Sequence, residues 1–386
     1  MKKFLSGIAR ALCVMSVCVI AGCSYAGDGG SGSTPPVTPS GNGGLVGTPT
    51  NGQLQGAIAK ETWMASNGNL MIENASGQKV EITKTSEVVV IPTGTVAKIN
   101  MTQEDAKGDL FTDSRKVKLS SFVMSQYQVT RGLFKAVMGE EYFTNLGTQA
   151  TANGTADENP VTQINWFEAI VFCNKLSRLC HLEPVYSYDF STDGSGKMTD
   201  PEDWFKDTTN LSETVPTSDS STNYANWKDK VVINLKANGY RLPTEAEWEF
   251  CARGGDPNEE DWGYTYSGSN TVTEVAWYEE NSNYSGTNIV GCMDKANKLG
   301  LYDMSGNVWE WCDDYYNSNV TVDDTQYTDS EGYVKDPLVV FASSYRGLRG
   351  GSWEFNASYC ECGYRKLNSS FSRFNYYGFR LVRSTN

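Results

Sequence analysis

The sequence is poor in histidine, which narrows the chemistry that the chain could perform. His181 is its single histidine, so a Ser-His-Asp triad would have to be built on this one residue. A glycine-rich phosphate loop with its lysine is also missing. The sequence thus gives no support to a hydrolase of the triad type or to an enzyme that cradles nucleotide phosphates.

Basic residues are scarce relative to acidic ones. The chain has 32 Lys and Arg against 46 Asp and Glu, a formal net charge of −14 at pH 7. Loss of residues 1–22 as a signal peptide would remove Lys2, Lys3 and Arg10 but no acidic residue, which lowers the net charge to −17. Because an acidic chain repels phosphate backbones, we expect no nucleic-acid partner.

The hydrophobic segment at the N-terminus, Ala11–Ala21, is too short to span a bilayer. It runs into Ile20-Ala21-Gly22-Cys23, which resembles a bacterial lipoprotein signal in which Cys23 becomes the lipidated first residue. An ordinary secretion signal cleaved nearby is the alternative. Because Ser24 and not Asp follows, the resemblance implies the outer membrane. We therefore expect a palmitate-bearing, surface-displayed lipoprotein that contacts the membrane through its lipid anchor only.

The composition changes along the mature chain. Residues 23–53 are rich in Gly, Ser, Thr and Pro with almost no hydrophobic content, so we expect a flexible tether. Residues 54–84 show a strand-like pattern with a turn signal at residues 66–69, which predicts an N-terminal hairpin extension. A buried strand predicted at residues 87–92 opens the main domain, which we place at residues 85–386.

Helices are few but well marked, and most other residues fit short strands and loops. This mixture predicts a loop-rich α+β domain. The helix-start signals are Thr130 before residues 131–138 and Gly139, Asn165 with Glu168, and Thr244 with Glu247.

Seven cysteines besides Cys23 remain in the mature chain, and they form no tight repeating framework. Cys251 and Cys312 stand in surroundings typical of small buried hydrophobes. One or two disulfides stay open as an alternative, because connectivity cannot be derived from sequence. The seven are Cys173, Cys180, Cys251, Cys292, Cys312, Cys360 and Cys362.

Six motifs occur in a fixed order and together resemble the formylglycine-generating enzyme, or sulfatase-modifying factor, family. The resemblance covers roughly residues 85–386 and implies the elaborated C-type-lectin-like fold of that family. The motifs are Tyr127–Thr130, Asn159–Val161, Asn165–Ala169, Gly239–Glu249, Leu299–Trp311 and the frame from Arg349 to Ser384.

The chemistry of that family lacks its ligands in this sequence. The resemblance implies a copper-dependent oxidase with two cysteines five residues apart, and here those positions are Phe355 and Cys360. Two thiolates are the minimum soft-ligand set for Cu(I), and Phe cannot supply one. Iron-dependent relatives need several histidines, whereas this chain has His181 alone. We therefore expect no copper and no enzyme, with an oxidoreductase of this family as the alternative.

Two groups of acidic residues invite functional interpretations. Glu245, Glu247 and Glu249 could suggest paired carboxylates of a glycosidase, but Glu247 fits a capping box and Glu245 suits the helix dipole. We favour this structural role. The second group is a possible structural calcium site.

The calcium site is implied by the family resemblance around residues 303–310. The implied ligands are Asp303, the carbonyls of Gly306 and Val308, and Glu310. Such oxygen ligands suit Ca²⁺. The alternative is that Glu310 only hydrogen-bonds the turn. Trp309 and Trp311, in the same motif, fit a core better than a ligand platform.

The segment 353–377 differs from its flanks. It is dense in aromatics, Ser, Asn and Gly without aliphatic periodicity, which favours a binding surface over a core segment. Between RGGSW and GFRLVRS it resembles the hypermutated segment of diversity-generating-retroelement variable proteins, where adenines, mostly in Asn codons, are randomised. Glu354, Glu361 and Lys366 do not fit randomised Asn codons. A static segment that has drifted is the alternative.

These observations predict a selectable binding face for an unknown protein or glycan ligand. A structural envelope protein without a ligand is a further alternative. The predicted ligand-binding residues are Glu354, Phe355, Asn356, Ser358, Tyr359, Glu361, Gly363, Leu367, Asn368, Ser370, Phe371, Ser372, Phe374, Asn375, Tyr376 and Tyr377.

Overall fold

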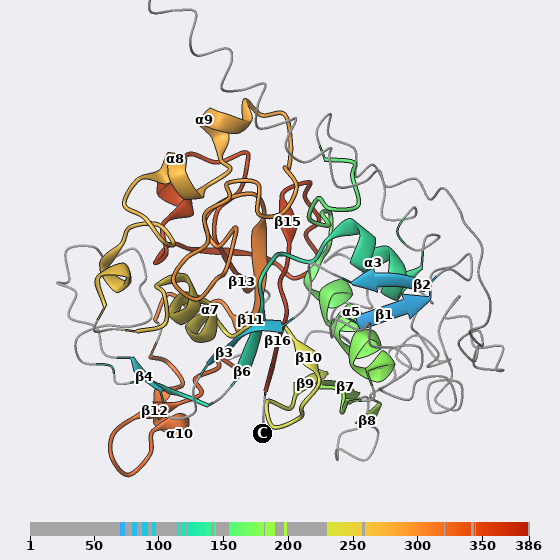
Figure 1. Ribbon diagram of the computed structural model, residues 1–386. Coiled ribbons are helices and arrows are strands. Elements are labelled where there is room, and N and C mark those ends of the chain that lie inside the picture. The colour runs from blue at the N-terminus through green and yellow to red at the C-terminus, as the bar shows by residue number, and fades with distance from the viewer. Residues whose placement is uncertain are drawn as a thin grey trace, which may run out of the picture. The chain divides into compact units, whose positions relative to one another are not determined.

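The computed structural model describes most of the chain from residue 115 onward and four strands before it (Figure 1). The described residues are 70–73, 79–82, 87–91, 95–97, 115–139, 143, 154–189, 197–198 and 230–384, without residues 116, 121, 181, 257–258, 320, 341–342 and 344. They all belong to one unit, residues 41–386. The predicted signal segment, Cys23 and the tether lie outside the described residues.

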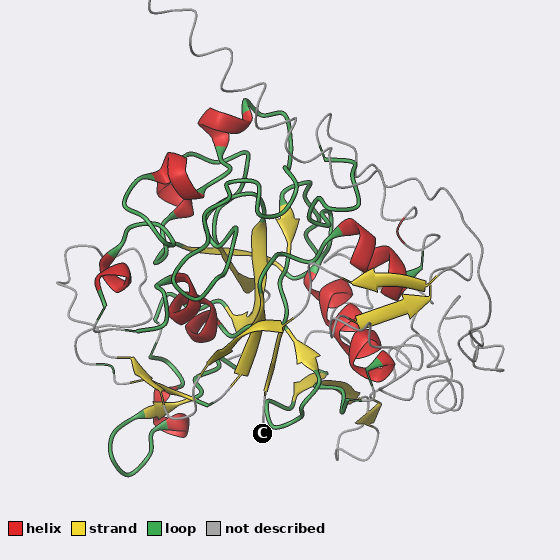
Figure 2. Ribbon diagram, viewed as in Figure 1, coloured by secondary structure: helices red, strands yellow, loops and turns green. Residues whose placement is uncertain are grey.

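Short helices are scattered between long loops, as Figure 2 shows, in agreement with the predicted loop-rich α+β fold. The helices are α3 (Arg131–Met138), α5 (Trp166–Leu179), α7 (Glu245–Ala252), α8 (Val272–Val275), α9 (Glu279–Ser282) and α10 (Asp324–Tyr327), with 3₁₀ turns η3 (Glu260–Gly263) and η4 (Ala357–Cys360). Within the described ranges, none of the helices is long and apolar enough to cross a membrane.

The three predicted helix starts are confirmed. The side chain of Thr130 accepts a hydrogen bond from the backbone N–H of Leu133 at the start of α3. Asn165 with Glu168 caps α5, and Thr244 with Glu247 caps α7, each as a complete capping box.

The strands of the described residues form five small sheets. Two carry the candidate site: β14 (Arg365–Ser369), β13 (Tyr345–Arg349), β11 (Trp309–Tyr315) and β15 (Tyr377–Gly378), in this order, and β10 (Tyr240–Arg241), β16 (Val382–Ser384), β6 (Phe122–Ser125) and β3 (Glu87–Ile91). The others are β12 (Val334–Lys335), β5 (Val117–Leu119) and β4 (Thr95–Ala97); β8 (Lys197–Met198), β7 (Tyr186–Asp189) and β9 (Val231–Ile233); and β1 (Leu70–Glu73) with β2 (Lys79–Ile82).

Strands β1 and β2 form an antiparallel hairpin. Leu70–Glu73 pairs with Lys79–Ile82. This hairpin falls within residues 54–84, where the sequence predicts one. The turn predicted at residues 66–69 lies outside the described residues.

Strand β11 separates two hydrophobic cores. Side chains alternate across a strand, so Trp309 and Trp311 point to one face and Cys312 to the other. The Trp face packs with α5, and the Cys312 face packs with α7 residues such as Trp248. In Figure 1 the two helices lie on opposite sides of this strand.

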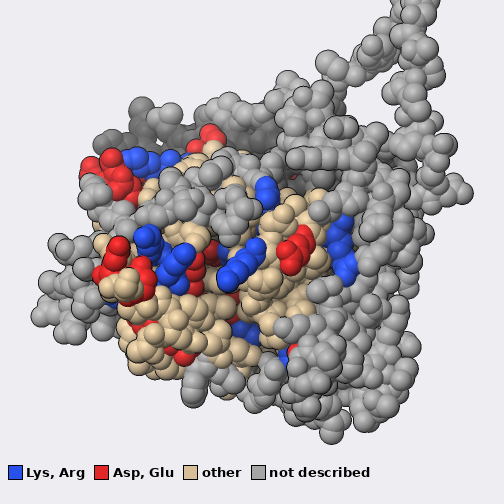
Figure 3. Space-filling model, turned by 90° about the horizontal axis from the view of Figure 1, so that it is seen from below, with Lys and Arg blue, Asp and Glu red and all other residues tan. Residues whose placement is uncertain are grey.

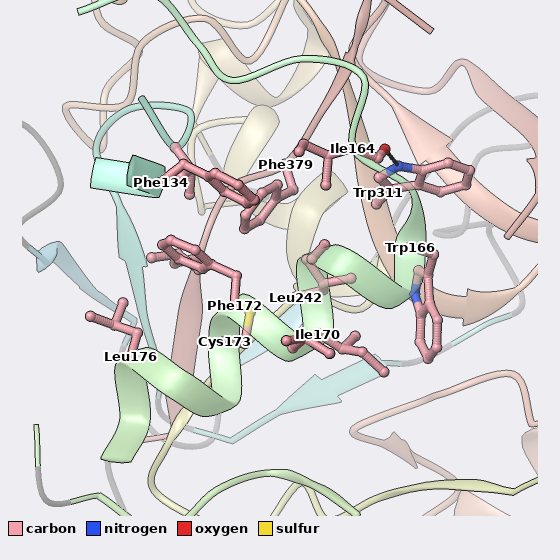
Figure 4. Packing of buried hydrophobic residues seen from close by; sticks show 14 of the residues in the cluster. Phe134, Ile164, Trp166, Ile170, Phe172, Cys173, Leu176, Leu242, Trp311 and Phe379 are labelled. Carbon is pink, nitrogen blue, oxygen red and sulfur yellow. Dashed lines mark hydrogen bonds between the residues drawn. The ribbon is translucent and has the colours of Figure 1, made fainter. Parts of the chain in front are cut away.

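Helix α5 supplies much of the first core. Phe172 stacks on Phe134 of α3 at 5.4 Å between ring centroids and meets Phe379 edge-on at 5.2 Å (Figure 4). The indole N–H of Trp311 donates to the carbonyl of Ile164, just before α5. These contacts join the helices to the C-terminal strands, so the last forty residues rest on a packed base.

Candidate ligand-binding face

Arg349 fixes the first flank of segment 353–377. Its guanidinium is fully buried and donates to Glu249 at 2.6 Å and to Glu245 at 3.1 Å. It also donates to the carbonyls of Cys362 and Tyr364. Because these two carbonyls belong to the segment, Arg349 ties the segment to α7.

Arg380 fixes the second flank in the same way. It makes two hydrogen bonds to Glu310, at 2.7 and 2.8 Å, and donates to the carbonyl of Tyr302. Trp248 donates its indole N–H to the same Glu310 carboxylate at 2.6 Å. Such bidentate, buried pairs are strong and directional. Both flanks therefore depend on charged groups that are completely paired.

Trp353 and Gly351 close the first flank. Trp353 is buried and donates its indole N–H to the carbonyl of Asn375, across the segment. Gly351 has a φ of +73°, and a Cβ there would lie 2.7 Å from the sulfur of Cys360. A glycine is thus required at this position by both conformation and space.

The glutamates of α7 have structural roles, as predicted. Glu247 completes the capping box and pairs with Arg241, while Glu245 pairs with Arg365 and Glu249 with Arg253. All three carboxylates are buried and paired, so they do not form a carboxylate pair open to a sugar.

The backbone of the segment is held by main-chain hydrogen bonds from the scaffold. The carbonyls of Phe355, Ser370, Phe374 and Tyr376 accept from the N–H groups of Glu279, Trp166, Gln163 and Trp309, respectively. Bonds of this kind involve no side-chain atom of the segment. Its path is therefore compatible with many different side chains.

Aromatic side chains of the segment gather over Trp309. The ring of Trp309 meets Phe355, Tyr359 and Tyr364 at centroid distances of 5.8, 6.2 and 5.9 Å. Phe355 also meets Tyr376 edge-on at 5.2 Å. Trp309 is buried, as expected for a core residue, but it also forms the floor of this cluster. We call Trp309, Phe355, Tyr359, Tyr364, Lys366 and Tyr376 the aromatic cluster.

The predicted ligand-binding residues fall into three groups by exposure. Asn356, Leu367 and Phe374 are exposed; Glu354, Phe355, Ser358, Tyr359, Glu361, Asn368, Ser372, Asn375 and Tyr376 are half-buried; Gly363, Ser370, Phe371 and Tyr377 are buried. Twelve of the sixteen thus keep surface that a ligand could contact.

The four buried positions need correction. Phe371 is only 4% exposed and packs against Phe167, and Tyr377 is completely buried against Trp311. Composition alone could not separate them from their neighbours, because the residue type does not tell whether an aromatic side chain lies in a core or on the surface. These side chains belong to the scaffold.

Two members of the aromatic cluster were missed in the sequence. Tyr364 lies in the segment and fits its composition, so it could have been included. Lys366 is a basic residue within the segment and does not share its aromatic, Ser and Asn composition. Its place on β14 carries the missing signal: Arg365 pairs with Glu245 on one side of the sheet, so Lys366 must face the other, aromatic side.

Lys366 is the cation of the cluster. Its Nζ lies 4.0 Å from the ring centroid of Phe355, 5.0 Å from that of Trp309 and 5.8 Å from that of Tyr376. Burial lowers the pKa of Lys366 to about 8, although nearby Glu354 acts in the opposite direction. Burial also raises the pKa of Glu354.

The predicted calcium ligands converge, but on a side-chain amide. The Nε2 atom of Gln128 lies 2.9 Å from Oε1 of Glu310 and 3.1 to 3.4 Å from the carbonyl oxygens of Asp303, Gly306 and Val308. The Asp303 carboxylate instead accepts from the N–H of Gly291. The calcium ion implied by the family resemblance would have to displace the Gln128 amide to bind at this place.

The family of the chain follows from comparison with known proteins. The model of the sulfatase-modifying factor enzyme 1-like domain matches residues 73–385. The chain belongs to this family. It resembles, among sequences, the chaperone protein LppX of Paenibacillus barcinonensis, with 32% identity over 70% of this chain and 82% of that protein.

Relatives of the sulfatase-modifying factor family include both enzymes and variable proteins. The formylglycine-generating enzyme of Thermomonospora curvata is 33% identical over 41% of this chain and 54% of its own. Among solved structures, Treponema denticola variable protein 1 has a TM-score of 0.57 and 32% identity, over 79% of this chain and 99% of its own. The fold class predicted from sequence is confirmed.

Phe355 and Cys360 occupy the positions where the family resemblance implies a pair of cysteines. Cys360 is completely buried and its pKa is raised to about 12, chiefly by burial, whereas Phe355 is half-buried. The seven described cysteines form no disulfide with one another. Phe355 carries no ligand atom, so these two positions offer one thiol and do not fit a two-thiolate copper centre.

Proposed function

We propose that this protein is a surface-displayed lipoprotein whose segment 353–377 forms a selectable ligand-binding face. The observation that carries the proposal is that the scaffold fixes the backbone of the segment but leaves most of its side chains at the surface. Its backbone is held by scaffold N–H groups and by Arg349, whereas twelve of its predicted contact side chains remain at least partly exposed. Such a design lets side chains change without loss of the fold.

The similarity to Treponema denticola variable protein 1 supports this proposal, because the two chains share sequence and fold over 99% of that protein. The composition of the face supports it as well. Aromatic side chains supply contact area at low entropic cost, and Ser and Asn supply adaptable hydrogen bonds. Phe355, Tyr359 and Tyr376 would be the aromatic anchors of such a face.

An oxidoreductase is the alternative from the same family. Against it stand Phe355, which has no ligand atom, and Cys360, whose buried thiol holds its proton. Cu(I) favours soft sulfur ligands, and of the positions 355 and 360 only Cys360 carries sulfur. We therefore propose binding and not oxidation as the function.

Lipid anchoring through Cys23 completes the proposal, with the outer membrane as location and residues 23–53 as tether. The surface of the folded part carries charges of both signs, interspersed on the face shown in Figure 3, which gives no broad basic patch for nucleic acid there. The partner would be a protein or a glycan. To test the anchor, Cys23→Ser is expressed with a radiolabelled fatty acid. We expect label and detergent partitioning in the wild type and neither in the variant, and a labelled variant would contradict the anchor.

The variable segment is tested at the level of its gene. The locus is sequenced in many descendants of one cell, together with its neighbourhood. We expect a nearly identical template copy, a reverse-transcriptase gene, and substitutions confined to the segment, with none at Arg349–Ser352 or Phe379–Arg383. Substitutions spread evenly through the gene, without a template copy, would show a static segment.

A further inference from the structure

The aromatic cluster contains an ammonium group, that of Lys366, which no described residue binds through a hydrogen bond or an ion pair. Lys366 makes neither a hydrogen bond nor an ion pair through its side chain to any described residue. It rests instead on ring faces, with Phe355 at 4.0 Å and Trp309 at 5.0 Å. Ring faces attract a cation but cannot accept its hydrogen bonds as an oxygen does. The three N–H bonds of Lys366 are therefore left to solvent or to a ligand.

Two further polar atoms of the same region are unpaired. Oε2 of Glu354 and Nε1 of Trp309 are buried and have no hydrogen-bond partner among the described residues. Buried polar atoms nearly always have a partner, so these two atoms are exceptions within one cluster. Trp309 is completely buried in the floor of the cluster, so a ligand lying over the cluster would meet Lys366 and Glu354 but not the indole N–H. Such a ligand could give Lys366 a carboxylate acceptor and Glu354 an N–H donor.

We propose that the face recognises a protein ligand through an acidic side chain, Asp or Glu, that lies on Lys366 beside an apolar residue packed on Phe355 and Tyr376. This inference rests on the proposed function and adds the chemistry of the ligand. A carboxylate supplies both the negative charge and the acceptors that the ammonium lacks. A peptide N–H of the ligand would donate to Glu354.

Charge and shape favour a protein ligand over an acidic polysaccharide. The chain has a net charge of −14, and Glu354 and Glu361 lie in the same segment as Lys366. The two arginines of the segment, Arg365 and Arg373, are paired with Glu245 and Glu168. A polyanion would be repelled, whereas one carboxylate in an apolar setting would not. The contact residues come from the whole stretch between residues 354 and 376 and are rich in Tyr, Phe, Ser and Asn, which is the composition of surfaces that bind proteins.

The electrostatics of the cluster agree with this geometry. The charged or titratable groups around Lys366 are Glu354 and the phenols of Tyr359, Tyr364, Tyr376 and Tyr377. Burial raises the pKa of Tyr364, Tyr376 and Tyr377, which are neutral at pH 7. With a pKa of about 8, Lys366 carries its charge at pH 7 but is poorly hydrated. A carboxylate bound beside Lys366 favours the protonated, charged form of the lysine. The affinity for such a ligand should therefore decline as the pH rises above about 8, where the free protein loses this charge.

The test uses the whole mature chain as bait for a phage-displayed library of random peptides. We expect enrichment of Asp or Glu next to an aromatic or aliphatic residue. A synthetic peptide of the enriched sequence should bind Lys366→Met at least about tenfold more weakly than wild type, and Lys366→Arg should restore much of the loss. Lys236→Met, at an exposed lysine between β9 and β10, is the matched control and should bind normally.

The outcomes separate this inference from the proposed function. Peptides that lose affinity with Tyr376→Ser but not with Lys366→Met, and that lack acidic residues, overturn the inference and leave the binding face intact. Peptides insensitive to Phe355→Ser, Tyr376→Ser and Lys366→Met bind elsewhere and count against both. If no peptide is enriched while a glycan array gives Lys366-dependent binding of an acidic glycan, the choice of a protein ligand is wrong.

Discussion

The amide nitrogen of Gln128 lies 2.9 Å from Oε1 of Glu310, at the centre of three backbone carbonyl oxygens. Glu310 is also held by Arg380 and Trp248, so its negative charge is compensated without a metal. One neutral side chain therefore connects the strand β6 region, the turn at residues 303–308 and β11. A group of oxygen atoms that could bind a cation is here hydrogen-bonded by the side-chain amide of Gln128.

This relationship predicts how the protein responds to calcium. Because Gln128 already occupies the centre of the oxygens, CaCl2 should leave the Tm of the wild type unchanged. Gln128→Ala should lower the free energy of unfolding by about 2–3 kcal/mol, since buried carbonyls would lose their donor. Differential scanning calorimetry with CaCl2 and with EDTA measures both. A wild-type Tm that rises with calcium would show that the amide yields to the ion.

A second prediction separates scaffold from face. Tyr376→Ser and Asn356→Ala should change the free energy of unfolding by no more than about 1 kcal/mol, because their side chains are half-buried or exposed. Trp353→Ala, Phe379→Ala and Phe371→Ala should each cost about 3–5 kcal/mol, because all three side chains are buried. Urea denaturation of the five variants decides it. If Tyr376→Ser lowers the free energy of unfolding as much as Trp353→Ala does, the segment is part of the core and the proposed binding face is wrong.

A third prediction concerns copper. The wild type should not compete with a chromophoric Cu(I) chelator, and it should not convert the cysteine of a sulfatase-type peptide to formylglycine. Phe355→Cys adds a second thiol and should give weak Cu(I) binding. That binding should disappear again in the double variant with Cys360→Ser. Tight copper binding or peptide oxidation by the wild type would reinstate the oxidoreductase alternative.

A fourth prediction follows from a buried carboxyl group behind the face. Asp313 accepts a hydrogen bond from the hydroxyl of Tyr186, but its second oxygen has no partner among the described residues. Burial raises its pKa from 3.8 to about 8, although Tyr186, Arg241 and Arg346 act in the opposite direction. The folded state thus holds a proton that the unfolded state releases, so this contribution is full below pH 4 and is lost as the pH rises toward 8.

The corresponding variant is Asp313→Asn, which keeps an acceptor for Tyr186 and removes the titration. Its free energy of unfolding should depend less on pH between 4 and 8 than that of the wild type, by up to about 1.4 kcal/mol per pH unit. Asp157→Asn, at an exposed aspartate, is the control. Equal slopes for all three proteins would mean that Asp313 is ionised in the fold.

The sequence predicted the scaffold better than the surface. Helix caps such as Asn165 with Glu168 depend on neighbours within four residues, so a local pattern reveals them. Phe371, Tyr377 and Gln128 depend on contacts with distant segments, and no local pattern separates a buried aromatic from an exposed one. Lys366 differs from them, because the alternation of side chains along β14 places it on the face, and this alternation becomes visible only once the pairing of β14 with β13 is known.

The pairing of β14 with β13 limits how this protein can evolve. Arg365 stands opposite Arg349 and Lys366 opposite Leu348, so neighbouring positions alternate between the side of the buried ion pairs and the side of the aromatic cluster. A single inserted or deleted residue would exchange these roles along the strand and place the Arg365 guanidinium among the aromatic rings. The fold therefore tolerates substitutions at many positions of the segment, but not insertions or deletions. A mutational process that copies a template base for base keeps the length constant and is the kind that this architecture tolerates.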